Sequence, residues 1–182
     1  SFQDARSFLE NGGERGPQME LIPPGTYRIN SLLFTVRLTD AINIPPGKIG
    51  VVEARDGKPL AGGRIIARQV ECDSFQDASA FMAGGERGPQ MGIIPPGTYR
   101  INPLLFEIQP ADVVDIPENK VGIVTTREGA PLAAGEIAGP AVAGHNMFQD
   151  PDAFVGNGGC KGLQEQVLLA GRYFINPRFA TI

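Results

Sequence analysis

Few residues of this chain have types and spacings that would support chemistry. His145 is its single histidine, and the two cysteines, Cys72 and Cys160, are far apart in the sequence. A metal site needs several ligands at short spacing, and nucleophilic catalysis needs a nucleophile with a base beside it. These residues supply neither arrangement. We therefore predict no catalytic residue, no metal and no cofactor, and the chain is expected not to be an enzyme.

The thiols of Cys72 and Cys160 are the remaining groups that could react, by redox chemistry. Cys160 lies in a Gly-rich turn beside Lys161, where a thiol is expected to be exposed and can be activated by the neighbouring cation. Cys72 aligns with His145 when the repeats described below are superposed, and this variation predicts a tolerant loop. Two cysteines are too few to staple a fold, so reduced thiols are expected. A redox role for Cys160 is the minor alternative.

Two acidic or Gly-rich patterns have simpler explanations than catalysis or phosphate binding. Asp150 and Asp152 stand at the start of a predicted helix, where carboxylates cap the backbone. The segment Gly84-Gly85-Glu86-Arg87-Gly88 lacks the strand, Lys-Ser/Thr and helix of a phosphate-binding loop. It is predicted to be a turn, with its Glu and Arg making surface or inter-unit contacts.

Composition narrows the class of protein. The 24 glycines and 16 prolines recur at fixed places between apolar segments, a pattern typical of turns in a strand-rich fold, and long helices are not expected. The net charge of −4 disfavours nucleic-acid binding, which needs an excess of Lys and Arg. No apolar run approaches the roughly 18 to 20 residues that span a bilayer. The segment itself is expected to be soluble, with no nucleic acid and no small-molecule substrate as partner.

An internal repeat is the strongest signal in the chain. Three motifs recur about 72 to 74 residues apart. They are Phe-Gln-Asp, Gly-Gly-Glu-Arg-Gly-Pro-Gln and Ile-Pro-Pro-Gly-Thr-Tyr-Arg-Ile-Asn, and the copies of the last one begin at Ile22, Ile94 and Leu168. The third copy is degraded. The Phe residues that open the copies are expected in the core, or less plausibly on an edge facing lipid or a partner; they are Phe2, Phe75 and Phe148.

The repeated motifs and the segments beside them predict turns and strands. Pro-Pro-Gly favours a type II turn, with Pro at the second position and Gly at φ > 0 at the third. The alternation in 98–102 predicts a strand with Tyr99 and Ile101 inward, and 48–55 and 120–127 predict further strands. The predicted structural turn residues are Pro24, Gly25, Pro46, Gly47, Pro96, Gly97 and Gly171.

Short helices are predicted after the Phe-Gln-Asp word. Asp150 caps, Pro151 fits the first helical position, and the glycines from Gly156 onward limit the helix to about two turns. Asp4 and Asp77 are expected to cap equivalent helices.

The expected fold class is therefore mainly β, or β-rich α+β, built from tandem small antiparallel units that each carry one short helix. We place the units at residues 41–112 and 113–182, with the C-terminal half of a unit at 1–40. This division keeps the strand at 48–55 on the same piece as the strand predicted at 98–109.

The last unit resembles a known family. Lys120-Val121-Gly122-Ile123-Val124, Phe148-Gln149-Asp150-Pro151 and the closing Gly171-Arg172-Tyr173-Phe174-Ile175-Asn176-Pro177 make 113–182 similar to the start of the stomatin–prohibitin–flotillin (SPFH, band 7) domain of bacterial flotillin-like proteins. The tandem N-terminal repeats depart from that family and bear a weaker likeness to the repeats of the major vault protein.

The resemblance implies a non-catalytic scaffold segment of a membrane-associated homo-oligomer that organises membrane microdomains. The anchor and the main oligomerisation region would lie outside these residues, and the side of the membrane is left open. A soluble cage-wall protein is the alternative, and an enzymatic or redox domain using Cys160 is the second.

Overall fold

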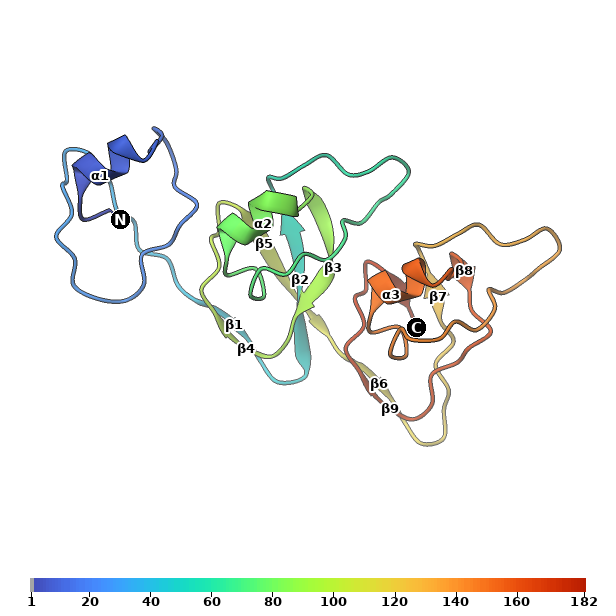
Figure 1. Cartoon of the computed structure of the whole chain (residues 1–182). Coiled ribbons are helices and arrows are strands. Elements are labelled where there is room, and N and C mark those ends of the chain that lie inside the picture. The colour runs from blue at the N-terminus through green and yellow to red at the C-terminus, as the bar shows by residue number, and fades with distance from the viewer. Residues whose placement is uncertain (1) are drawn as a thin grey trace.

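The computed structural model describes residues 2–182 as three small lobes that follow one another along the chain, each with one short helix on the same side (Figure 1). We call residues 2–40, 41–112 and 113–182 lobes 1, 2 and 3. Strands far outnumber helices, and every strand pairing is antiparallel. The predicted β-rich α+β class with small antiparallel sheets is confirmed.

Lobe 2 is the most complete of the three. Its strand β2 lies between β3 and β5, while β1 pairs separately with β4. The pairing of β2 with β5 runs over seven residues, from Lys48 opposite Asp112 to Ala54 opposite Phe106. The elements are β1 (Ile42–Ile44), β2 (Lys48–Ala54), α2 (Ala78–Gly84), β3 (Gly88–Ile94), β4 (Gly97–Tyr99) and β5 (Phe106–Asp112).

The single strand expected over 98–109 is two strands, because a turn separates β4 from β5. The backbone N–H groups of Leu105 and Phe106 both donate to the carbonyl of Asn102, which closes that turn. Ile101 is buried as predicted, at 2% exposure, although it lies outside β4.

Lobe 3 repeats the arrangement with shorter strands. Here β7 lies between β10 and β8, and β6 pairs with β9. The strand expected over 120–127 is reduced to two residues, Thr125 and Thr126, which pair with both β8 and β10. The elements are β6 (Val114–Ile116), β7 (Thr125–Thr126), α3 (Pro151–Gly156), β8 (Gly162–Leu163), β9 (Gly171–Tyr173) and β10 (Ala180–Thr181).

Lobe 1 contains α1 (Ala5–Glu10) and, within residues 2–40, no strand. The words that form β3 and β4 in lobe 2 are present in lobe 1 with nearly the same sequence. Their partners in lobe 2 are β2 and β1, and lobe 1 has no counterpart of either.

Each helix begins at the predicted aspartate. The Asp4 carboxylate accepts the N–H groups of Arg6 and Ser7, and this bonding lowers the pKa of Asp4. Asp77 accepts from Ala80, and Asp150 accepts from Ala153. Capping satisfies backbone donors that have no partner inside the helix.

One phenylalanine from each helix enters an aromatic cluster. The ring of Phe81 meets that of Phe106 edge-on, with 4.8 Å between centroids, and Phe154 meets Phe179 in the same way at 5.5 Å. Phe75 and Phe148 are 4% and 1% exposed, so the core placement of these two residues is confirmed.

The glutamines of the repeated motifs make hydrogen bonds that hold each lobe together. In Phe-Gln-Asp, the glutamine side chain accepts a backbone N–H from the closing segment, as Gln76 does from Arg100 and Gln149 from Phe174. In the Gly-Gly turn, the amide of Gln90 donates to the carbonyls of Glu86 and Gly88. These side-chain bonds add to the backbone pairing of the lobe, which at this turn includes the bridges Lys58–Glu86 and Ala67–Gln90.

The Pro-Pro-Gly words do not all form the predicted type II turn. Gly47 has φ +82°, and Lys48 N–H donates to Pro45 O at 3.1 Å, as that turn requires with Pro46 at its second position. Gly97 and Gly171, at +155° and +154°, instead open strands β4 and β9.

The type II prediction is therefore wrong at Pro96-Gly97 and at Pro24-Gly25, since Gly25 is not among the glycines with positive φ. The physical reason at Gly97 is that the chain must extend at once to pair with β1. A side chain there would still be opposed, because its Cβ would meet Tyr99 Oη at 3.0 Å.

Candidate inter-unit interface

His145 is a buried structural residue. It is 2% exposed, its Nδ1 accepts the N–H of Phe148 at 2.8 Å, and its Nε2 lies 3.1 Å from Gln166 Oε1. The neutral ring with the proton on Nε2 satisfies both contacts. The position lies in a loop, as predicted, but the loop is packed, because the ring lies against Phe148 and Phe154.

The cysteines do not form a reactive pair. Cys72 is 4% exposed, and burial raises the pKa of its thiol, which keeps it protonated. Cys160, expected to be exposed, is half-buried in the turn, with Sγ 3.9 Å from Gly158 O. Both thiols are free.

The described residues contain no group of three or more His, Cys, Asp or Glu side chains placed to hold a metal ion. None of the helices in residues 2–182 has both the length and the apolar character to cross a bilayer. The Glu86 carboxylate, expected at the surface or between units, stays within its own lobe and accepts the N–H of Ala61 at 3.1 Å.

A hydrogen-bonded contact made by an asparagine side chain recurs between consecutive lobes. At the border of lobes 2 and 3, the side-chain amide of Asn176 donates to Gln90 O at 2.8 Å and to Met91 O at 3.0 Å. Asn176 Oδ1 accepts the N–H of Arg178, which fixes the direction of the amide. Because Asn176 is 2% exposed, these bonds are made away from water.

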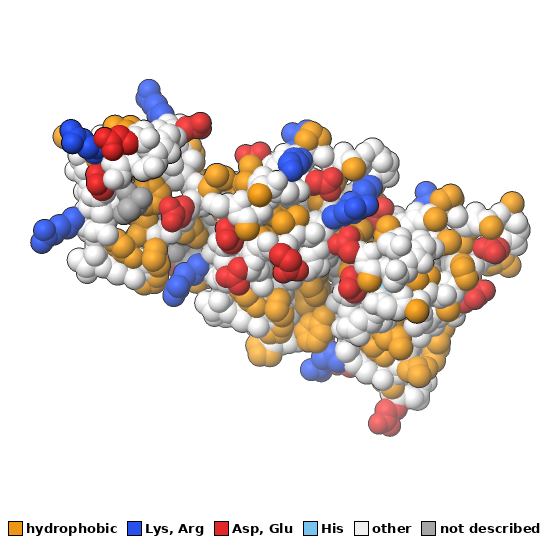
Figure 2. Space-filling model, in the orientation of Figure 1, with side chains coloured by type: hydrophobic (Ala, Val, Ile, Leu, Met, Phe, Trp, Pro, Cys, Tyr) orange, Lys and Arg blue, Asp and Glu red, His pale blue; other side chains and the backbone are white. Residues whose placement is uncertain are grey.

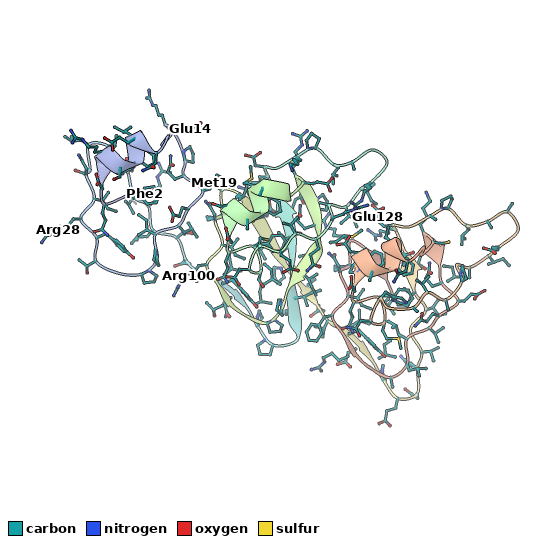
Figure 3. The ribbon with its side chains drawn as sticks, in the orientation of Figure 1. Phe2, Glu14, Met19, Arg28, Arg100 and Glu128 are labelled. Atoms are coloured by element: carbon teal, nitrogen blue, oxygen red, sulfur yellow. The ribbon has the colours of Figure 1, made fainter. Side chains whose placement is uncertain are left out.

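The border of lobes 1 and 2 has the same bond. Asn102 donates to Met19 O at 2.9 Å and to Gln18 O at 3.3 Å, and its Oδ1 accepts from Leu104. Met19 lies at this border in Figure 3. One asparagine from each following lobe therefore holds the Gln-Met segment of the lobe before it, and we call this contact the asparagine clamp.

Two carboxylates strengthen the second border. Glu128, labelled between lobes 2 and 3 in Figure 3, accepts the N–H groups of Ile65 and Ile66 at 2.8 and 3.2 Å. Asp152, in the first turn of α3, accepts the N–H of Gln69 at 2.7 Å. Hydrogen bonds to charged acceptors are stronger than neutral ones, about 1.5–3 kcal/mol each.

The apolar core also crosses this border. Ile66 and Met91 belong to lobe 2, yet they are 2% and 1% exposed and pack in the cluster formed by Val124, Phe154 and their neighbours in lobe 3. The ion pair between Arg178 and Glu53 at 3.5 Å is half-exposed, so it contributes little to the attachment. Lobe 3 is thus attached through shared core and buried polar bonds.

Sequence reasoning identified the repeat word but not its inter-unit role. The available signal was an asparagine present in all three copies at the end of a predicted strand, at positions 30, 102 and 176. The helix-capping aspartates bond to their own helices, and none of the inter-lobe hydrogen bonds described above involves a predicted turn glycine. Glu128 has an acidic counterpart in lobe 2, Asp56, but the Asp56 carboxylate accepts the N–H of its neighbour Gly57 instead of a bond from another lobe.

We expect Asn176→Ala to destabilise lobe 3 by about 1–3 kcal/mol, because it leaves the buried carbonyls of Gln90 and Met91 without donors. Asn30→Ala is the matched control. Asn30 makes the same local bond from Leu32 N–H to its Oδ1 but is exposed. Urea unfolding followed by circular dichroism measures both, and equal losses would contradict the clamp.

The three lobes thus form a row joined by one repeated polar contact and, at the second border, by shared core. Comparison of the chain with models of protein families, with curated proteins and with solved structures finds no match.

Proposed function

We propose that this chain is a non-catalytic scaffold segment of a membrane-associated oligomeric protein, in the manner of flotillin-like microdomain organisers. The observation that carries the scaffold proposal is the asparagine clamp, which joins consecutive lobes with the same donor and the same acceptors twice. A contact of this kind holds successive units at a defined spacing, as in repeat proteins whose units contact their neighbours.

The membrane part of the proposal is supported by the sequence resemblance of 113–182 to the SPFH domain. Its anchor and its oligomerisation region would lie outside residues 1–182. A soluble cage-wall protein, similar to the major vault protein, is the second candidate, because a row of β-rich lobes also suits the wall of a closed shell. A redox function of Cys160 is not favoured by its position in the turn.

The purified 182-residue chain is expected to be monomeric or weakly associated. Flotillin-like proteins assemble chiefly through a coiled coil, and these repeats contain no sustained heptads. Multi-angle light scattering at several concentrations checks this. A ring whose mass stays constant on dilution would place the main assembly contacts within these residues.

The experiment that tests the function is fractionation of the cells that make the protein. An epitope inserted between Ala134 and Gly135, both exposed, reports its position. The scaffold proposal expects a large complex that sediments with membranes and enters solution with detergent. A large complex in the soluble fraction supports the cage wall instead, and a small soluble species contradicts both.

A further inference from the structure

Two cationic residues stand opposite each other where the pairing of β7 with β8 ends in lobe 3. Thr126 pairs with Gly162, so the next residues of the register, Arg127 and Lys161, face each other. Opposite residues of an antiparallel pair point to the same face, with Cβ atoms roughly 4.5–5.5 Å apart. Both residues are exposed. Like charges placed in this way repel each other and destabilise the pair.

The backbone fixes the positions of these two residues. Arg127 N–H donates to Phe179 O at 2.8 Å, and Lys161 N–H donates to Ala130 O at 2.9 Å. Within residues 2–182, neither side chain takes part in an ion pair. The part of the chain that the structure describes therefore supplies no negative partner that relieves their repulsion.

Lobe 2 has the same pair of cations but neutralises it. The register places Arg55 opposite Arg87, and both line an open groove of about 610 Å³. Arg55 forms an ion pair with Glu107 at 3.3 Å. Hydrogen bonds from Gln109 and Arg55 lower the pKa of Glu107, so its carboxylate is charged at neutral pH and offsets one of the two cations.

The acidic residues beside the lobe 2 pair are replaced by threonines in lobe 3. Glu53 stands opposite Glu107 in the sheet of lobe 2, and Thr125 stands opposite Thr181 at the same places of the repeat in lobe 3. Lobe 3 thus keeps both cations and has hydroxyl groups where lobe 2 has carboxylates. A hydroxyl group can donate a hydrogen bond to an anion, which a carboxylate repels.

The exposure of the cation pair is a property of its position within the lobe. Arg55 and Arg87 remain exposed although lobe 3 lies beside them, and the side chain of Arg55 is 54% exposed. On the face drawn in Figure 2, Lys and Arg side chains are scattered among acidic ones. Because the net charge is −4, the local pair and not the whole molecule must attract an anion.

We propose that Arg127 and Lys161 form a binding site for a phosphate group. A guanidinium binds two phosphate oxygens through parallel N–H donors, and the lysine adds a second positive charge. A bound phosphate removes the repulsion between the two cations, and the hydroxyl groups of Thr125 and Thr181 lie on the same face of the sheet. The phosphate belongs to a phospholipid head group or to a free phosphorylated molecule.

The first test is a titration of the whole chain with inorganic phosphate, followed by NMR at an ionic strength held constant with chloride. Saturable amide shifts are expected at 125–127 and 161–163 and not at the lobe 2 counterparts 53–55 and 87–89. Thr181→Glu restores the acidic residue of lobe 2 and is expected to abolish the shifts. Thr181→Gln, which adds no charge, is the matched control and should retain them.

The second test creates the site in lobe 2. Glu107→Gln removes the partner of Arg55 and is expected to give saturable phosphate shifts at 53–55 and 87–89. Dispersed amide spectra show that each variant is folded. Equal shifts in the two lobes of the parent chain would overturn the proposal, as would phosphate binding that survives Thr181→Glu. A lobe 2 that gains no binding in Glu107→Gln would contradict it as well.

Sedimentation with vesicles identifies the source of the phosphate. The chain is mixed with phosphatidylcholine vesicles that either contain or lack phosphatidic acid. Sedimentation that requires phosphatidic acid, is lost in Thr181→Glu and is kept in Thr181→Gln assigns the site to a lipid head group. Binding of inorganic phosphate without sedimentation assigns it to a free phosphorylated molecule. The site does not rest on the scaffold proposal, which the cell fractionation tests separately.

Discussion

Residues 41–112 made alone should unfold cooperatively, whereas residues 74–146 should not fold. The piece 41–112 contains β1 to β5, with β2 between β3 and β5. It also contains the whole core cluster around Ile44, Phe81 and Phe106. The other piece holds β3 and β5 without β2, and β7 without β8 and β10. Unpaired strands and an uncovered apolar face leave such a piece without a stable core.

The piece 41–112 loses the contacts that lobe 2 makes with lobe 3 in the whole chain. Ile66 and Met91 are buried under lobe 3 in the whole chain, so both become exposed in the piece 41–112. A unit of this size is also marginal on its own. The prediction is therefore that 41–112 folds better than 74–146, and not that 41–112 is as stable as it is in the whole chain. Dispersed amide resonances and a single thermal transition should be seen for 41–112 alone, and the reverse pattern would move the unit boundary to the Phe-Gln-Asp word.

Gly85→Ala should destabilise lobe 2 by about 1–3 kcal/mol, the usual range for overpacking a core. A Cβ at Gly85 would lie 2.6 Å from the Phe81 ring and 2.7 Å from Phe81 O. Phe81 is fully buried against Phe75 and Phe106, so the ring has no room to move aside.

Gly84→Ala is the control for this prediction. Gly84 is adjacent, ends α2, and nothing lies within 4 Å of a Cβ built there. Alanine at that position should be neutral or stabilise by up to about 1 kcal/mol, because glycine is a poor helix former. Thermal melts followed by circular dichroism separate the two variants. Equal behaviour would mean that the second glycine of the word does not support the phenylalanine ring.

This pair of glycines also shows what the fold of one lobe requires of its sequence. The ring of the helix phenylalanine occupies the space that a side chain on the second glycine would need, and the chain continues from this glycine into β3. The glutamine of the same word then holds the turn from inside through its amide. The sequence of this motif is thus explained by packing and by satisfaction of backbone carbonyls, in agreement with the predicted turn.

Much of the local structure was determined by the sequence itself. The aspartates at 4, 77 and 150 begin helices because a carboxylate before an apolar turn satisfies free N–H groups whatever surrounds it. The glycine after Pro46 takes positive φ because no Cβ opposes it there. Period and turn residues were enough to predict small antiparallel units.

The tertiary structure alone decided which of these words became strands and which residues join the lobes. The word Ile-Pro-Pro-Gly-Thr-Tyr-Arg-Ile-Asn opens β4 at Gly97, yet forms no strand at Gly25, although the residues are identical. The reason is that a strand exists only through a partner, and β1 pairs with the second copy and not the first. The clamp of Asn176 on Gln90 and Met91 likewise joins residues more than eighty positions apart, a proximity that only the folded chain creates.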